Sequence, residues 1–346
     1  MDLLFPRYGA TVWTGGGAEK MRRGWIAIGI LLLSAALFSA GLVRKLASLR
    51  GSEPSSERII AVIPKAVENS WWNQVRLGAL AGAQGTPYRV VWNGPALESD
   101  HISQIIFLEH ALARRSAAVV IAPNDSLALS RPVEEAAARI PCVLIDSPLA
   151  ETGQLPLVAT DNYRAGELAA RLLASAIDGR GKVLVINHLR NSESTEERAR
   201  GFAAAMADDY PEIRVVQSPY AETSLMDYRA QTAELLARHP DTAAVFAVNL
   251  ETSEGVCRAL QREYHARKVK FVGFDSSALL AGSLADGGIE ALIVQNPFEI
   301  GRRGVRRALD ALENRQGEAF TAIPVFVVTR RNLERMKRKF PAALGL

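Results

Sequence analysis

The sequence predicts an α/β protein of two similar lobes, each a parallel sheet with helices on both faces. Short apolar runs alternate with amphipathic stretches from residue 59 onward, which is typical of parallel sheets covered by helices. One arrangement also occurs twice: Ala117–Ile121 is echoed by Ala243–Ala247, and about twenty-five residues later Val143–Asp146 is echoed by Phe271–Asp275. Ligands of open α/β sheets lie outside the carboxyl ends of the strands. The repeat therefore predicts two lobes that each direct an aspartate at a shared ligand.

A hydrophobic segment near the N-terminus predicts a signal peptide or membrane anchor within residues 1–50. The twenty residues Gly24–Val43 contain no charged side chain and are long enough to span a bilayer as a helix. Lys20, Arg22 and Arg23 precede this segment, as in the basic region of a signal peptide.

Cleavage and retention of this segment both remain open. The small residues Ser39–Gly41 offer a cleavage site, whereas Arg44 and Lys45 directly after the apolar run favour a retained anchor. Met21 is an alternative start of the chain. Either outcome places the remaining chain in the periplasm or otherwise outside the cytoplasm, after a polar linker over residues 51–58.

The first half of the body alternates between strand and helix patterns. Short apolar runs that end at turn residues indicate strands, and apolar residues at helical spacing indicate helices. The expected strands are Ile59–Ile63, Tyr88–Trp92, Ala117–Ile121, Cys142–Asp146 and the extended run Leu155–Thr160; the expected helices lie near Trp72–Ala83, Ile102–Arg114 and Leu127–Arg139.

The second half repeats this pattern with one more strand. The expected strands are Lys182–Asn187, Ile213–Gln217, Ala243–Val248, Lys270–Phe274, Ala291–Gln295 and Pro324–Val328. The expected helices lie near Arg164–Ile177, Glu196–Asp208, Met226–His239, Ser253–Tyr264, Ser277–Ala285 and Glu299–Leu312.

Composition excludes several classes of function. The 346 residues are 48% hydrophobic and 23% charged, as in globular proteins, and the net charge of +4 comes from basic residues near both ends. The acidic body lacks the basic face that a nucleic-acid partner requires. The scattered histidines argue against a zinc site, so no metal is expected, and the absence of a nucleophile elbow or P-loop gives no support to an enzyme or a cofactor. Cys142 and Cys257 are expected to be free buried thiols.

Six motifs follow the expected strands in a consistent order. They are Glu68-Asn69-Ser70-Trp71-Trp72, Asp146, Arg198 in Glu197–Phe202, Asn249, Gly273-Phe274-Asp275, and Gln295 before Asn296-Pro297. In order and spacing they resemble the bacterial ribose- and galactose-type sugar-binding proteins, which serve ABC importers and chemoreceptors. The same fold forms the effector domain of lactose-repressor-type regulators. The resemblance covers roughly Arg58 to Arg331.

The resemblance implies a sugar site between the lobes. Asp146 and Asp275 would each accept hydrogen bonds from sugar hydroxyls, because a carboxylate has two acceptor oxygens. Arg198 would donate its guanidinium fork to ring and hydroxyl oxygens. Asn69, Asn249 and Gln295 would supply amides that both donate and accept. Trp71 and Trp72 would stack on the C–H faces of the sugar, although core packing is the alternative for both.

The resemblance also implies a domain plan with three crossovers. The first lobe would comprise residues 59–161 and 296–323, and the second residues 162–295 and 324–340. The chain would pass between lobes near Thr160–Asn162, Gln295–Pro297 and Ile323–Val325. The lobes would then close on a ligand by hinge motion.

Three departures from the family pattern bear on the ligand. Ala122-Pro123 stands where ribose-type members have Asn-Pro, Asp146-Ser147 where they have Asp-Arg, and Asn249-Leu250 where they have Asn-Asp. The first lobe therefore lacks polar contacts for a small pentose, and the sugar stays open. The expected function is an extracytoplasmic sugar receptor that delivers its ligand to an ABC importer permease. The alternative is a membrane-anchored sensor that signals to a histidine kinase or chemoreceptor; a repressor is disfavoured because no helix-turn-helix is present.

Overall fold

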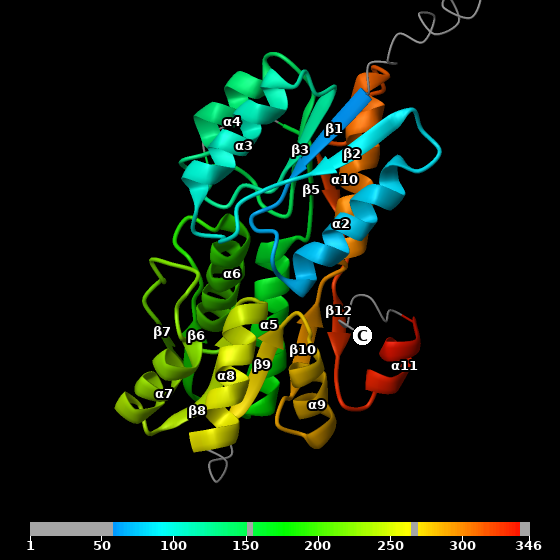
Figure 1. Ribbon diagram of the computed structural model, residues 1–346. Helices are drawn as coiled ribbons and strands as arrows, with labels where there is room; N and C mark the ends of the chain where they lie inside the picture. Colours follow the sequence, from blue (N-terminus) through cyan, green and yellow to red (C-terminus); the bar gives the residue numbers. More distant parts are fainter. Residues whose placement is uncertain (1–57, 151–154, 264–268, 340–346) are drawn as a thin grey trace, which may run out of the picture. The chain divides into compact units, whose positions relative to one another are not determined.

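The computed structural model describes residues 58–150, 155–263 and 269–339. Within these ranges no helix combines the length and the apolar character that a membrane crossing needs. The hydrophobic segment 24–43 and nearly all of the expected linker lie outside the described residues. Figure 1 shows the described part, which begins with β1 at Arg58.

The first lobe is built on a six-stranded parallel sheet. Its strands, in the order β11-β5-β4-β3-β1-β2, run parallel at each adjacent pair. Their bounds are β1 Arg58–Ile63, β2 Tyr88–Trp92, β3 Ala118–Ile121, β4 Cys142–Ile145, β5 Leu157–Ala159 and β11 Phe320–Ala322. The residues of β3 and β4 are all buried, as expected for strands covered on both faces.

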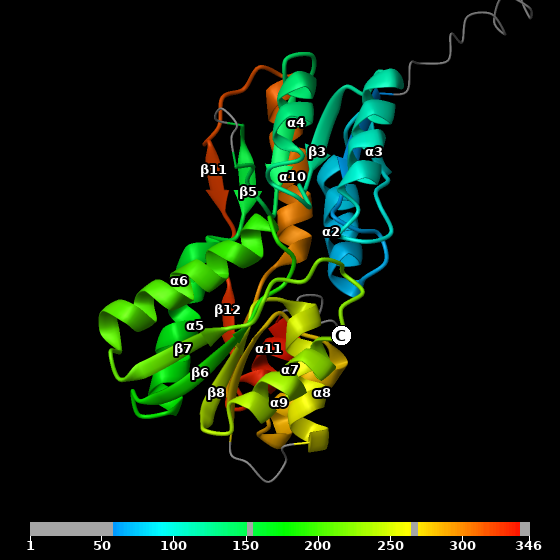
Figure 2. The same cartoon turned by 90° about the vertical axis from the view of Figure 1, so that its left-hand side faces the viewer.

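Helices cover both faces of this sheet. α2 (Ser70–Ala83) and α10 (Pro297–Leu312) pack on one face against Val62 and Val120, whereas α3 (His101–Ala113) and α4 (Ser130–Ala137) pack on the other. Successive strand residues point to opposite faces, so Ile63 and Ile121 pack in the apolar cluster on the face that α3 and α4 cover. Figure 1 shows α3 and α4 on one side of these strands and α2 and α10 on the other, and Figure 2 shows the lobe from the side of α3 and α4.

The second lobe has the same plan with one exception. The strands β6 Gly181–Ile186, β7 Ile213–Gln217, β8 Thr242–Ala247, β9 Lys270–Phe274, β10 Ala291–Val294 and β12 Phe326–Val328 form a sheet in the order β12-β10-β9-β8-β6-β7. Strand β12 is antiparallel to β10, so the expectation of a purely parallel sheet is wrong at this edge. The chain enters β12 directly from the first lobe without a crossover helix, and this entry reverses the direction of the strand.

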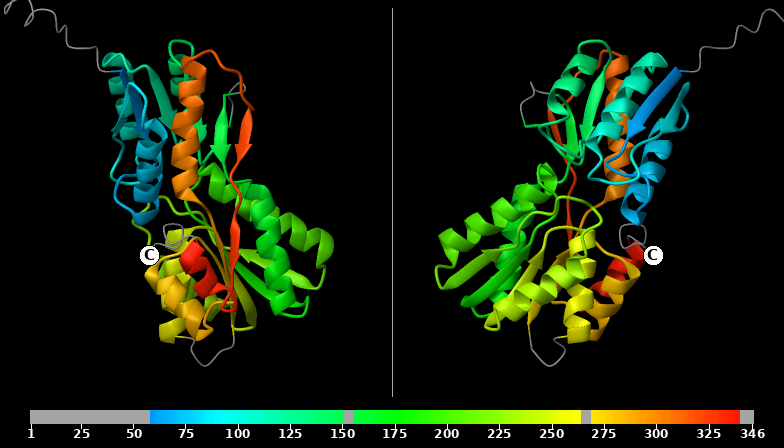
Figure 3. Two further views of the ribbon diagram at one scale, coloured as in Figure 1. Left: turned by 90° about the vertical axis from the view of Figure 1, so that its right-hand side faces the viewer. Right: turned by 60° about the vertical axis from the view of Figure 1, so that its left-hand side comes forward.

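The helices of the second lobe also form two layers. α5 (Asn162–Ala176) and α6 (Glu193–Asp209) share one apolar cluster with the sheet. α7 (Tyr228–Arg238), α8 (Leu250–Glu263), α9 (Ala278–Asp286) and α11 (Leu333–Lys339) belong to the opposite layer. Both views of Figure 3 show these helices on either side of the strands.

The chain passes between the two sheets at three points. The passages follow β5, β10 and β11, at residues 160–161, 295–296 and 323–325. Two of them are joined directly, because the Thr160 hydroxyl donates to Gln295 Oε1 at 2.9 Å. The segments that would bend during a hinge motion are therefore short and adjacent.

Two short elements escaped the sequence analysis. β11 is a three-residue edge strand with the exposed Phe320, and α11 contains mostly charged residues, so neither shows a strong apolar period. The expected helix near Leu127 begins only at Ser130. Asp125 Oδ1 accepts from the backbone N–H groups of Leu127 and Ala128, which holds that stretch as a turn.

Paired glycines allow close helix crossings in both lobes. A Cβ on Gly78 or Gly301 would lie 1.9 or 2.0 Å from a backbone oxygen of the facing helix in the α2–α10 pair. In the α5–α6 pair a Cβ on Gly166 would lie 2.1 Å from Arg198 O, and one on Gly201 would lie 2.1 Å from Tyr163 O. The second crossing fixes α6, and with it Arg198, against the sheet.

Gly201→Ala is expected to destabilise the protein by roughly 1–3 kcal/mol, because the added methyl meets backbone that cannot move aside. Gly282→Ala in α9 is the matched control: its Cβ meets nothing within 4 Å, so it should gain roughly 0.5–1 kcal/mol from helix propensity. Urea denaturation of both variants measures the difference. Equal stability of the two variants would contradict the close crossing.

Candidate functional site

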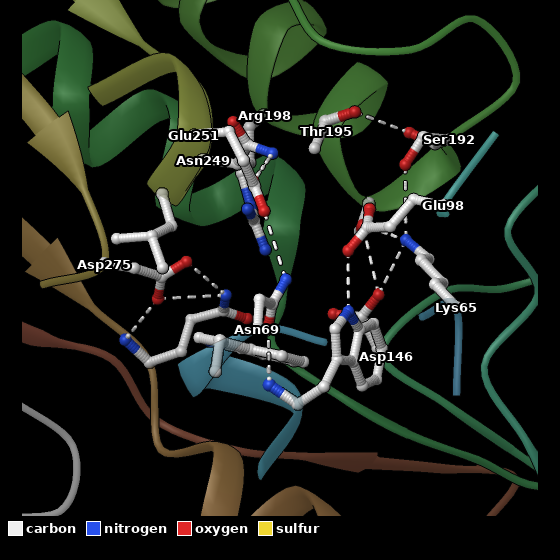
Figure 4. Close-up of a pocket in the computed structure, with 15 residues that line it drawn as sticks. Lys65, Asn69, Glu98, Asp146, Ser192, Thr195, Arg198, Asn249, Glu251 and Asp275 are labelled. Atoms are coloured by element: carbon white, nitrogen blue, oxygen red, sulfur yellow. Dashed lines mark hydrogen bonds and ion pairs between the residues drawn. The ribbon is translucent and has the colours of Figure 1, made fainter. Parts of the chain in front are cut away.

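A pocket that opens to solvent lies at the carboxyl ends of strands from both sheets, with about 350 Å³ of empty space when the solvent at its mouth is included. All eight residues expected at the site line it: Asn69, Trp71, Trp72, Asp146, Arg198, Asn249, Asp275 and Gln295. The structure adds seven that the sequence analysis missed: Lys65, Glu98, Ser192, Ser194, Thr195, Leu250 and Glu251. Figure 4 shows the polar groups of both lobes converging on this space.

The two aspartates occupy equivalent positions in the two lobes. Asp146 directly follows β4 and Asp275 directly follows β9, and both have a left-handed backbone, with φ of 65° and 60°. This conformation is uncommon for residues other than glycine and is concentrated at functional sites. The repeat that the sequence suggested is thus a repeat in backbone geometry.

Asp275 accepts hydrogen bonds from Gln295, which lies in one of the passages between the lobes. Gln295 donates to it from its backbone N–H and from Nε2, at 3.4 and 3.2 Å. Burial raises the pKa of Asp275 to about 6, although the positive charge of Arg198 and the bonds from Gln295 act in the opposite direction. Because Gln295 also accepts from Thr160, Asp275 is connected to two of the three passages between the lobes.

Arg198 projects from α6 with one nitrogen unpaired. Its side chain lies 3.9 Å over the Phe274 ring, and it donates from Nε to Asn162 Oδ1 at 2.9 Å and from Nη1 to the Val248 carbonyl at 3.0 Å. Burial lowers the pKa of Arg198. Among the residues that the structure describes, none accepts a hydrogen bond from Nη2, which is buried. Buried donors normally have a partner, so Nη2 is a free contact for a ligand.

Asn69 and Asn249 are both oriented by helix capping. Asn69 Oδ1 accepts from the Trp72 N–H, and Asn249 Oδ1 accepts from the N–H and hydroxyl of Thr252. Their amide nitrogens therefore face away from the helix ends that the oxygens cap. Both nitrogens donate to the Glu251 carboxylate, at 3.1 Å from Asn69 and 2.8 Å from Asn249. The two amides expected to bind sugar thus share a carboxylate at the pocket wall.

The two tryptophans differ in burial. Trp72 is 2% exposed, lies in the core cluster of the first lobe and donates from Nε1 to Glu98 at 2.6 Å. Trp71 is only partly buried and packs against the clusters of both lobes. Its Nε1 is buried, and no partner for it lies among the described residues. Trp72 is therefore a core residue, whereas the indole N–H of Trp71 remains available at the pocket, with no partner among the described residues.

Lys65 places a cation beside Asp146, where Ser147 stands in place of the arginine of ribose-type members. Its ammonium lies 2.8 Å from Asp146 Oδ2 and donates across the pocket to Ser192 and Ser194, at 3.3 and 2.9 Å. Lys65 is 3% exposed. One oxygen of Asp146 is therefore already engaged, and the first lobe contacts the start of α6 through the hydrogen bonds of Lys65 to the two serines.

A second bond across the pocket involves Glu98. Its carboxylate lies 3.4 Å from His188 Nε2, and His188 Nδ1 contacts the Tyr228 hydroxyl at 2.7 Å. Burial acts to raise the pKa of Glu98, but the hydrogen bond and charge of His188 outweigh it, with help from Lys65 and Trp72, and lower this pKa to about 2.

The missed residues lacked a sequence signal of their own. Lys65 stands two residues after the expected strand Ile59–Ile63, in the loop that leads to Asn69. Glu251 stands two residues after Asn249, in the first turn of α8. Glu98 lies in a loop, and Ser192 and Ser194 lie at the start of α6; only the fold brings them to the pocket.

Glu251 is expected to make the empty protein less stable at neutral than at acidic pH. Burial and the nearby charge of Glu98 raise its pKa from 4.5 to about 7. The stability that its protonated form contributes is fully present below pH 4.5 and is lost as pH rises through 7. Relative to Glu251→Gln, the wild type should therefore lose free energy of unfolding between pH 5 and 8. A constant difference across urea titrations in this range would contradict the raised pKa.

Comparison with known proteins identifies the family. The model of the periplasmic binding protein domain matches residues 60–316, so the chain belongs to this family. The ribose import binding protein of Bacillus subtilis is 30% identical over 236 residues, which cover 68% of this chain and 75% of that protein. The ribose import binding protein of Escherichia coli K12 is 28% identical over 276 residues, which cover 78% of this chain and 90% of that protein.

Solved structures agree in fold. A carbohydrate transporter solute-binding protein from Agrobacterium radiobacter in complex with D-arabinose superposes with a TM-score of 0.79 at 32% identity, covering 84% of this chain and all of that one. A solute-binding protein from Agrobacterium vitis with bound D-fucose superposes with a TM-score of 0.76 at 32% identity. The superposition covers 83% of this chain and 99% of that one. The expected resemblance to ribose-type binding proteins is confirmed, and these relatives are solute-binding proteins of transporters.

Proposed function

We propose that this protein binds a sugar between its two lobes, outside the cytoplasm, and delivers it to an ABC importer. The observation that carries the proposal is a pair of buried donors in one pocket, Arg198 Nη2 and Trp71 Nε1, which find no acceptor in the described part of the chain and lie beside the carboxylate of Asp275. Sugar hydroxyls both donate and accept, so one ring can satisfy the two donors and the carboxylate together. The sugars bound by the Agrobacterium relatives support this class of ligand.

The proposed mechanism is closure of the lobes about the passages at residues 160–161, 295–296 and 323–325. A ligand that contacts both Asp146 in the first lobe and Asp275 in the second has a higher affinity for the closed state, and so shifts the population toward it. The permease would then recognise the closed form. We assign residues 59–161 and 296–323 to the first lobe, and 162–295 and 324–340 to the second.

The constellation is that of a binding site. It offers an aromatic face, carboxylates and amides for hydroxyl groups. Its carboxylates are engaged by Lys65, Gln295, two amides and two serine hydroxyls. The relatives named above are import proteins, so they give no support to a sensor that signals to a kinase.

A ligand panel tests the proposal. The full-length chain is heated with pentoses, hexoses, amino sugars and polyols, and a ligand that binds only the folded state raises the melting temperature in a saturable way. We expect a shift with one stereochemical group of sugars, confirmed by isothermal titration. Melting temperatures that stay constant across the panel would reject sugar binding.

A further inference from the structure

The pocket carries more acidic than basic side chains. Four carboxylates line it, those of Glu98, Asp146, Glu251 and Asp275, against the two permanent cations Lys65 and Arg198. Lys65 is committed to Asp146 at 2.8 Å, and Glu98 lies 3.4 Å from His188. Arg198 is the positive charge that acts most strongly on Asp275. Glu251 is the carboxylate that remains.

Glu251 accepts hydrogen bonds but forms no ion pair with the described residues, although the charge of His188 acts on it from a greater distance. Its two oxygens accept from Asn69 Nδ2 and Asn249 Nδ2, and no Lys, Arg or His nitrogen of the described residues lies within ion-pair distance of it. The capping bonds of both asparagines fix which end of each amide faces the carboxylate. The two N–H donors favour the ionised form of Glu251, whereas burial and the charge of Glu98 disfavour it and raise its pKa. A partly buried carboxylate in this form is most stable beside a positive charge.

Trp71 adds a second feature suited to a cation. Its partly buried ring meets the ring of Trp72 edge to face, with centroids 4.6 Å apart, and lines the same pocket as Glu251. The faces of tryptophan rings attract ammonium groups, most strongly where water is excluded. A carboxylate and an indole in one cleft form a site for a protonated amine.

We propose that the ligand of this protein is a sugar that carries a protonated amine, such as a hexosamine, and that Glu251 pairs with this amine. The inference rests on the proposed function, because the hydroxyl groups of the same ligand would engage Arg198 and Asp275. A neutral sugar at this site would leave the ionised form of Glu251 without a cation, whereas a protonated amine would stabilise it.

Isothermal titration of the full-length chain at pH 7 with matched sugars tests the inference. D-glucose, D-galactose and D-mannose are each compared with the corresponding 2-amino and 2-acetamido sugars, which differ at one position. The amino form of at least one stereoisomer should bind about tenfold or more tightly than its neutral counterparts. Glu251→Gln should remove this preference. Glu254→Gln, which lies on the same helix, pairs with Arg258 and does not line the pocket, should keep it.

Each outcome is decisive. Neutral sugars that bind as tightly as the amino sugars would overturn the inference and leave the proposed function intact. An amine preference that survives Glu251→Gln would also overturn it. If none of the nine sugars binds, the inference fails together with the hexose part of the proposed function, and the wider panel of pentoses and polyols then decides the latter. The wild-type comparison is informative even if Glu251→Gln does not fold.

Discussion

Asp275→Asn is expected to weaken sugar binding by about 100-fold without lowering the melting temperature of the empty protein. A hydrogen bond to a charged group contributes about 1.5–3 kcal/mol, and 1.4 kcal/mol corresponds to a factor of ten in affinity. The amide that replaces the carboxylate keeps its size but offers only one acceptor oxygen.

The stability of this variant should move in the opposite direction. Burial raises the pKa of Asp275 to about 6, so the stability linked to its protonated form is fully present below pH 3.8 and lost as pH rises through 6. At pH 7.5 the wild type has lost this contribution, whereas Asn is neutral at every pH. The melting temperature should stay constant or rise.

Asp286→Asn is the matched control for this substitution. Asp286 is exposed at the end of α9 and does not line the pocket, so binding and melting should match those of the wild type. Unchanged affinity of Asp275→Asn would remove this residue from the site. A lowered melting temperature with lost binding would indicate a structural role instead.

Trp72→Ala is expected to lower the free energy of unfolding by about 3–5 kcal/mol, the range for deleting a large buried aromatic side chain. Trp72 is 2% exposed, and its loss also removes the partner of Glu98 at 2.6 Å. Trp71→Ala should cost less stability, because this side chain is only partly buried, and should lower the sugar affinity at least tenfold through loss of its stacking face and free N–H.

Urea denaturation and titration of both variants separate these roles. The prediction is a large loss of stability for Trp72→Ala and a predominant loss of affinity for Trp71→Ala. The reverse assignment, with Trp71→Ala the less stable variant, would show that Trp71 is the core residue.

The fold was largely predictable because buried strands produce a strong local signal. Runs such as Val143–Ile145 and Phe271–Phe274 are apolar and end at a polar residue, so both their type and the position of the following aspartate follow from the sequence. The direction of β12 was not predictable, because an antiparallel edge strand has the same composition as a parallel one.

The positions of the site residues were easier to predict than their partners. The eight expected residues share one pocket, but the ion pair of Lys65 with Asp146 and the bond of Asn69 to Glu251 depend on contacts between distant segments. Trp71 and Trp72 are adjacent and chemically identical, so the sequence left both roles open for both residues. Their difference arises from the helix phase, which turns Trp72 into the core.

The most direct test of sugar binding between the lobes is a crystal structure of the chain with the best ligand from the panel. The account predicts one sugar in contact with both lobes, with Arg198 Nη2 and Trp71 Nε1 each within hydrogen-bond distance of a ligand oxygen and Asp275 accepting from a hydroxyl. A ligand bound elsewhere, or one that leaves both donors unpaired, would contradict it.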